Sequence, residues 1–277
     1  MNHKHTINIR GEIMDLVTPK VMGIVNLTPD SFYEGSRRQK ENEVLKLVEK
    51  MLSDGVDIID VGGYSSRPGA SDVSETEELS RTVDAIVQIK KEFPDSVLSI
   101  DTFRSNVARE AVSAGADLVN DISAGHLDDQ MMSTVAELNV PYIAMHMRGT
   151  PQNMKANTDY DDLMKEVMSY FSHVIELSNQ LGIKDLIIDP GFGFAKTIEQ
   201  NYYLLNHLEH FRWLDRPILV GLSRKSMIYK PLHLTADKAL NGTIALNTVA
   251  LVKGAGILRV HDVKEAVETV KLMNQLG

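Results

Sequence analysis

The sequence predicts a single (β/α)8 barrel, in which eight parallel strands alternate with eight helices. Short runs rich in Val, Ile and Leu, typical of strands buried on both faces, alternate along the chain with amphipathic stretches. The length of 277 residues is close to the ~250 typical of one such barrel. No linker or change in composition divides the chain, so we expect one domain over residues 1–277.

The elements are expected in a regular order after an N-terminal hairpin. Residues 5–17 alternate in polarity, as a hairpin covering the N-terminal end of the barrel would. Ser74 and Glu77 have the spacing of a capping box that opens the second helix. The strands are expected at VMGIV 21–25, VDII 56–59, VLSI 97–100, DLV 117–119, YIAM 142–145, DLII 185–188, ILVGL 218–222 and ILRV 257–260, and the other helices at 41–54, 104–115, 128–139, 159–181, 197–209, 236–253 and 263–276.

Composition excludes several classes of protein and site. The chain has no cysteine, which excludes disulfides, thiolate metal sites and cysteine nucleophiles. No apolar run approaches the ~18 residues of a membrane span, and the N-terminus lacks the apolar core of a signal peptide. A net charge of −9 argues against a surface that coats nucleic acid. We expect a cytoplasmic protein without a membrane or nucleic-acid partner.

Each apolar run ends on a polar residue that is capable of chemistry. In a (β/α)8 barrel the C-terminal ends of the strands open onto the active site, so this pattern predicts an enzyme. Arg259 and His261 lie two residues apart on the last strand and should project to the same side, near where such barrels often hold phosphate. The strand-end residues are Asn26, Asp60, Asp101, Asn120, Asp121, His146, Asp189, Ser223, Arg224, Lys225, Arg259 and His261.

Seven motifs follow one another along the chain. They are GIVNLTPDSFYEG at 23–35, GVDIIDVGGYSSRP at 55–68, SIDT at 99–102, LVNDI at 118–122, IDPGFGFAK at 188–196, SRKS at 223–226 and RVHD at 259–262. Together they resemble the signatures of the dihydropteroate synthases, pterin-binding barrel enzymes that join a pterin to p-aminobenzoate. The resemblance extends from about Val21 to Val263.

This resemblance implies a reaction of folate biosynthesis. In it, 6-hydroxymethyl-7,8-dihydropterin diphosphate and p-aminobenzoate condense to 7,8-dihydropteroate and pyrophosphate. A pterin edge carries adjacent N–H donors, and the Asp189 carboxylate is expected to accept two of them. The implied pterin-binding residues are Asp101, Asn120, Ile122, Met145, Asp189, Gly193, Lys225 and Arg259.

The resemblance also implies where the second substrate and the leaving group bind. Asn26 is expected to ligate Mg²⁺, which grips the pyrophosphate. Asn26, Arg67, Lys225, Arg259 and His261 are the expected catalytic residues. The expected pyrophosphate-binding residues are Asn26, Arg67, Arg259 and His261, and those for p-aminobenzoate are Phe32, Ser66, Arg67, Pro68, Phe194, Lys225 and Ser226.

The loops after the first two strands are long and rich in Gly, Pro and polar residues, so we interpret them as lids. They also contain the departures from the family pattern, which bear on loop dynamics and inhibitor sensitivity. The segment GFGFAKT shows no extra residues next to the expected wall of the aryl-amine site, which predicts ordinary sensitivity to sulfonamides. The departures are Tyr33, Glu34, Ser36, Tyr64 and Ser66.

Three other interpretations stay open, together with the oligomeric state. A methyltetrahydrofolate-type methyltransferase shares the pterin-binding Asp and Asn, and an aldolase could form a Schiff base on Lys225. The third is a non-catalytic pterin-binding barrel. Barrel synthases of the type that the motifs resemble are usually homodimers, and the helices near 200–210 and 236–253 offer apolar surface.

Overall fold

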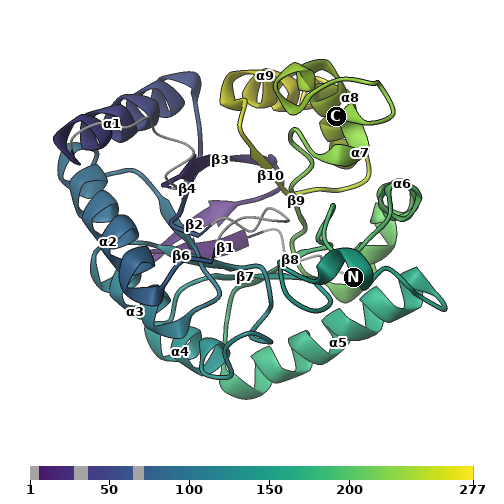
Figure 1. Ribbon diagram of the computed structural model, residues 1–277, viewed down its shortest axis with the longest axis horizontal. Helices are drawn as coiled ribbons and strands as arrows, with labels where there is room; N and C mark the ends of the chain where they lie inside the picture. The colour runs from purple at the N-terminus through teal and green to yellow at the C-terminus, as the bar shows by residue number, and fades with distance from the viewer. Residues whose placement is uncertain (1–5, 28–36, 65–71, 277) are drawn as a thin grey trace.

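The computed structural model describes residues 6–27, 37–64 and 72–276, without the side chains of residues 37–41. Eight parallel strands form one curved sheet with the helices outside it (Figure 1). The strands are β3 (Lys20–Asn26), β4 (Ile58–Gly62), β5 (Leu98–Asp101), β6 (Leu118–Asp121), β7 (Tyr142–Met145), β8 (Leu186–Asp189), β9 (Leu219–Val220) and β10 (Ile257–Val260).

The sheet closes on itself. Its order is β8-β7-β6-β5-β4-β3-β10-β9, and a parallel bridge between Ile188 and Ile218 joins the two outer strands. The predicted (β/α)8 barrel is therefore confirmed. None of the helices within the described residues is long and apolar enough to cross a membrane.

Helices follow the strands in the predicted order, with shifted ends. The longer helices are α1 (Arg37–Asp54), α2 (Glu75–Glu92), α3 (Ser105–Ser113), α4 (Met131–Leu138), α5 (Leu163–Leu181), α6 (Ile198–Asn206), α8 (Leu240–Val252) and α9 (Val263–Met273). The shorter ones are α7 (Ser226–Tyr229) and the 3-10 helices η2 (Met154–Ala156), η3 (Leu208–Leu214) and η4 (Ala236–Lys238).

Hydrogen bonds of side chains explain two differences from the predicted helices. The helix expected at 197–209 ends at Asn206, where His207 Nδ1 contacts the carbonyl oxygen of Tyr203 at 2.8 Å and η3 follows. Ser74 caps α2 by accepting from the Glu77 N–H at 3.3 Å, but the Glu77 carboxylate bonds to Arg81. Glu77 thus forms an i,i+4 ion pair in place of the second half of the predicted capping box.

The hairpin closes the N-terminal end of the barrel, as predicted. Strands β1 (Thr6–Ile9) and β2 (Glu12–Asp15) are antiparallel, and the turn at Arg10 and Gly11 has φ of 53° and 88°, as primed hairpin turns require. Ile7 and Ile9 are buried against apolar side chains from the strands of the barrel. These are Met22, Ile58, Leu118, Ile143, Ile187, Leu219 and Ile257.

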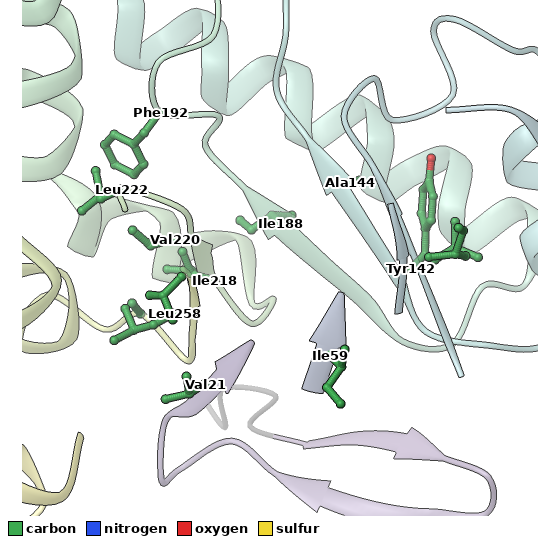
Figure 2. Packing of buried hydrophobic residues seen from close by; sticks show 14 of the residues in the cluster. Val21, Ile59, Tyr142, Ala144, Ile188, Phe192, Ile218, Val220, Leu222 and Leu258 are labelled. Atoms are coloured by element: carbon green, nitrogen blue, oxygen red, sulfur yellow. The ribbon is translucent and has the colours of Figure 1, made fainter. Parts of the chain in front are cut away.

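Alternation along the strands separates this inner layer from an outer apolar layer that meets the helices. Figure 2 shows Ile218, Val220 and Leu258 of the outer cluster gathered at one part of the barrel wall. Polar side chains continue the inner layer beyond Ile58 and Leu118 because residues i and i+2 share a face. The period of two therefore brings Asp60 and Asn120 to the C-terminal half of the interior, above the apolar layer.

Gly23 lets two helices approach β3. A Cβ at this position would lie 2.9 Å from Met51 Sδ on α1 and 2.9 Å from Val263 Cγ2 on α9. We expect Gly23→Ala to lower the free energy of unfolding by about 1–3 kcal/mol through overpacking. Urea denaturation measures this change. Gly256→Ala is the control because its nearest neighbours lie 3.8 Å from the added Cβ; equal effects of the two substitutions would contradict the packing argument.

Candidate active site

Arg259 on β10 joins carboxylates from two other strands inside the barrel. Its Nε lies 2.6 Å from Asp60 Oδ2 on β4, and its Nη2 lies 2.6 Å from Asp101 Oδ2 on β5. Asp60 is fully buried and its side chain has no exposed surface. Because a guanidinium carries five N–H donors, these two bonds leave Arg259 with donors for a ligand.

Asp60 also holds Asn120, which orients the amide on β6. Asn120 Nδ2 donates to Asp60 Oδ2 at 3.0 Å, so one carboxylate oxygen serves both Asn120 and Arg259. The amide nitrogen is thereby committed, which fixes the side chain with its oxygen as an acceptor. Asp60 was recognised in the sequence as a strand-end residue but not as part of the site. Its place at the end of an apolar run is the signal that could have included it.

Burial and charge tune the acids of this group. Burial raises the pKa of Asp101 to about 7, although the Arg259 guanidinium opposes the shift. For Arg259, burial disfavours the charge, but the carboxylates of Asp60 and Asp101 outweigh that effect and raise its pKa. Arg259 is thus permanently charged, whereas Asp101 can exchange a proton near neutral pH. Asp101 can act as a donor or an acceptor toward a heterocycle.

Asp189 and Lys225 lie within electrostatic reach of each other and of Arg259. Burial raises the pKa of Asp189, which is opposed by the Lys225 charge, and Asp189 Oδ1 accepts from the Gly191 N–H at 2.8 Å. Burial lowers the pKa of Lys225 to about 8, with Asp189 acting against the shift. Lys225 Nζ donates to the carbonyl oxygen of Phe192. The predicted carboxylate and lysine are thus close enough to influence each other.

Gly193 and Phe194 form a surface under the Lys225 side chain. Gly193 has φ of +79°, and a Cβ there would lie 3.1 Å from Lys225 Cδ, so both the conformation and the space favour glycine. Lys225 Nζ lies 4.8 Å from the centre of the Phe194 ring. An ammonium over an aromatic face is attracted by the ring quadrupole. The lysine is held by packing as well as by charge.

Apolar side chains next to these groups form one cluster that contains three of the predicted residues. Ile122 and Met145 are buried in it, and Phe194 packs against it half-buried. Asp121 shapes this region because its carboxylate accepts from the N–H groups of Ser123 and Gly125, both at 2.7 Å. The cluster offers a flat heterocycle an apolar wall.

The remaining described residues lie at strand ends. Asn26 ends β3, is partly buried, and lies opposite Gly62 in the register with β4. Ser226 begins α7 directly after Lys225. His261 follows β10, and its Nδ1 lies 3.0 Å from Ser223 Oγ.

Two other residues of the sequence motifs have structural contacts. Arg224 is turned away in an ion pair with Asp262, with Nε–Oδ2 and Nη2–Oδ1 distances of 3.0 and 2.5 Å. Tyr64, one of the departures from the family pattern, is buried and its hydroxyl accepts from Gln152 Nε2 at 2.7 Å. It therefore ties the chain after β4 to the segment after β7.

Several predicted residues lie outside the described part of the chain. Phe32, Tyr33, Glu34 and Ser36 belong to residues 28–36. The other segment, 65–71, contains Ser66, Arg67 and Pro68. Their assigned roles, and the lid interpretation of both loops, stay predictions.

Lys196, which is not among the residues expected at the site from sequence, anchors the turn that contains Asp189, Gly193 and Phe194. Lys196 Nζ lies 2.9 Å from His146 Nδ1, and it donates to the carbonyl oxygens of Gly191 and Phe194, each at 3.1 Å. Burial lowers the pKa of Lys196 to about 7. The pKa of His146 is lowered well below its usual value, mainly because the ring is buried and secondly because of the nearby Lys196 charge. Its place at the end of the GFGFAK motif is the sequence signal that could have identified Lys196 as part of the site.

The lowered pKa of Lys196 should appear in the pH dependence of stability. Between about pH 7 and pH 10 the unfolded chain keeps the proton that folded Lys196 has lost, so stability rises with pH in this window. Replacing Lys196 with Met removes this contribution, which amounts to at most about 1.4 kcal/mol per pH unit. Urea denaturation between pH 7 and pH 9 compares the slopes.

The exposed Lys91→Met variant is the control for this experiment and should keep the slope of the unaltered protein. A slope for Lys196→Met equal to that of the control would show that Lys196 stays charged in the folded protein.

Known proteins resemble this chain over nearly its whole length. Residues 22–261 match the family described as pterin binding enzyme. The dihydropteroate synthase of Escherichia coli K12 is 41% identical over 266 residues, covering 95% of this chain and 94% of the relative. That of Clostridium beijerinckii is 43% identical over 255 residues, covering 91% and 92%.

Solved structures give the same result. Yersinia pestis dihydropteroate synthase in a sulfonamide drug complex superposes with a TM-score of 0.92 at 41% identity, covering 98% of both chains. The Xanthomonas albilineans enzyme with 4-aminobenzoic acid has a TM-score of 0.91 at 36% identity and the same coverage. The chain therefore belongs to the family of pterin-binding enzymes and, within it, to the dihydropteroate synthases.

Proposed function

We propose that this protein condenses 6-hydroxymethyl-7,8-dihydropterin diphosphate with p-aminobenzoate, releasing pyrophosphate and 7,8-dihydropteroate. The observation that carries this proposal is the convergence of Asp101, Asn120, Asp189, Lys225 and Arg259 at one end of the barrel. The chain is also 41% identical to a dihydropteroate synthase over nearly its whole length. The activity is that of a transferase in folate biosynthesis.

The pterin is recognised by groups that match its polar edge and its flat faces. Adjacent N–H groups of the ring donate hydrogen bonds to the Asp189 carboxylate. Asn120 and Asp101 bind the rest of the polar edge. Met145 and Ile122 supply apolar contact. The planar Arg259 guanidinium can stack on the ring while its free N–H groups bind an anion.

The p-aminobenzoate ring is proposed to bind beside Phe194, with Lys225 and Ser226 near its polar groups. The 4.8 Å contact between Lys225 Nζ and the Phe194 ring supports a shared surface for an aryl group. Phe32, Ser66, Arg67 and Pro68 complete this pocket in the proposal. Sulfonamides share the aryl amine and are proposed to compete there, as the sulfonamide complex of the Yersinia pestis relative suggests.

Departure of pyrophosphate is helped by fixed positive charge and N–H donors. Arg259, His261 and Arg67 are the proposed contacts, and fixed donors stabilise the developing anion without reorganisation. Bond cleavage leaves a pterin methylene cation that the amine of p-aminobenzoate attacks, and the resulting ammonium loses a proton to solvent. No nucleophile on the protein is needed, so catalysis consists of positioning and electrostatic stabilisation.

Mg²⁺ remains part of the proposal. The Asn26 amide oxygen is a hard donor, and Mg²⁺ usually binds one or two protein oxygens together with water and phosphate oxygens. Among the described residues no group of three His, Cys, Asp or Glu side chains could hold a metal ion, and Asn26 is the residue proposed to contact Mg²⁺. When bound, Mg²⁺ would neutralise charge on the diphosphate.

The first experiment measures pyrophosphate release by the purified protein with the pterin diphosphate and Mg²⁺, with and without p-aminobenzoate. We expect release that depends on p-aminobenzoate, with dihydropteroate formed in step and a sulfonamide raising the apparent KM for p-aminobenzoate. Pterin binding without release would favour the methyltransferase or the non-catalytic binder. A borohydride-trapped adduct on Lys225 would favour the aldolase.

Asn26→Ala tests the assigned role of the first strand end. Because Asn26 is proposed to act on the leaving group, turnover should fall by about 100-fold or more while pterin affinity, measured by calorimetry, changes little. Asn42→Ala, at an exposed position of α1, is the matched control. Equal losses in turnover and pterin affinity would contradict the assignment.

We also propose a homodimer formed through α6, η3 and α8. Lys253 and Glu209 form an ion pair 2.9 Å long that brings η3 beside the end of α8, where Val252 is 64% exposed. Trp213 on η3 is 75% exposed. These exposed apolar side chains, with Tyr202 and Tyr203 on α6, would be covered by a second copy of the chain.

Sedimentation equilibrium tests the dimer. Val252→Glu should shift the protein toward monomer because it places a charge in the proposed interface. Ile13→Glu, at an exposed position of the hairpin on β2, is the control. A monomer before substitution would contradict the proposal.

The cytoplasmic location stays a prediction from the sequence.

A further inference from the structure

Ser223 contacts both the backbone and the ring of His261. Its Oγ accepts from the His261 backbone N–H at 3.2 Å and lies 3.0 Å from His261 Nδ1. The serine follows β9 and is 5% exposed, whereas His261 follows the neighbouring strand β10. The two residues thus connect the C-terminal ends of adjacent strands.

The hydrogen-bonding capacity of a hydroxyl assigns direction to these contacts. A serine hydroxyl has one hydrogen to donate and two lone pairs. The His261 N–H occupies one lone pair, and His261 Nδ1 is the acceptor that the described residues offer to the hydroxyl hydrogen. An unpaired buried donor costs free energy, so the arrangement O–H···Nδ1 is favoured. Nδ1 then carries no hydrogen, and the proton of the neutral ring lies on Nε2.

We propose that Ser223 is a positioning residue that holds His261 in the Nε2–H tautomer. When the ring is neutral, this tautomer places an N–H donor on Nε2 that can serve a phosphate oxygen, instead of a lone pair that would repel it. This inference rests on the proposed function for its catalytic consequence, since it concerns the leaving diphosphate. The tautomer itself follows from contacts within the protein.

The turn around Ser223 is held in place independently of any ligand. Arg224 has φ of +57°, and its guanidinium binds both carboxylate oxygens of Asp262, the residue after His261. The Arg224 N–H also donates to Thr243 Oγ1 at 3.2 Å. The bidentate pair of Arg224 and Asp262 ties the segment after β9 to the segment after β10. Ser223 and His261 are therefore kept opposite each other.

The first test is spectroscopic and needs no substrate. Two-bond ¹H–¹⁵N correlations of histidine-labelled protein distinguish the tautomers, and His261→Gln assigns the signals. Spectra are recorded at rising pH until the His261 shifts stop changing, so that the ring is neutral. We expect Nε2–H in the unaltered protein and a shift toward Nδ1–H in Ser223→Ala. An Nδ1–H ring in the unaltered protein, or an unchanged tautomer in Ser223→Ala, would overturn the proposal.

The second test is kinetic. Ser223→Ala should lower kcat by about five- to tenfold, the effect of one lost hydrogen bond, without changing the KM for p-aminobenzoate. Ser223→Thr keeps the hydroxyl and should restore kcat and the tautomer. Ser172→Ala, at an exposed position of α5, is the control. Equal losses for the Ala and Thr variants would overturn the proposal.

The two tests separate this inference from the proposed function. If the unaltered protein showed the Nε2–H tautomer but no synthase activity, the proposed function would fail while the control of the tautomer by Ser223 stood.

Discussion

The site depends on one partly buried cation shared by two carboxylates. Asp60 and Asp101 both bind Arg259, and the bonds connect β4, β5 and β10 across the interior. Charges in such a place are stable only when they are paired and hydrogen-bonded. The guanidinium therefore allows the barrel to keep two carboxylates beside its ligand site, and the oxygen of Asp60 that it binds also orients Asn120.

The other half of the site is held through backbone groups. Asp189 accepts from the Gly191 N–H, Lys225 donates to the Phe192 carbonyl oxygen, and Lys196 binds the carbonyl oxygens of Gly191 and Phe194. The turn after β8 is thus held by two lysines, one of them on its own segment and one following β9. Rigid support of this kind keeps the groups that bind the substrates in fixed positions, which matters most where catalysis consists of positioning.

The barrel interior divides into an apolar end and a polar end. Met22, Ile58 and Leu118 pack against the hairpin at one end, and Asp60 and Asn120 follow two residues later on their strands. The apolar layer supplies stability through removal of surface from water. Polar residues can then occupy the opposite end without weakening the core. Chemistry and stability are placed at different depths of the same strands.

The sequence alone determined the barrel, the hairpin and the residues at the strand ends. These follow from local pattern, since each apolar run ends on a polar residue, which places Asp101, Asn120 and Asp189 at the open end of the barrel. Only the tertiary structure decided which of these groups meet. Asp60 and Arg259 are 199 residues apart, and Lys196 is 50 residues from His146. Such pairs depend on strand order and register, which bring distant residues together and which local pattern does not encode.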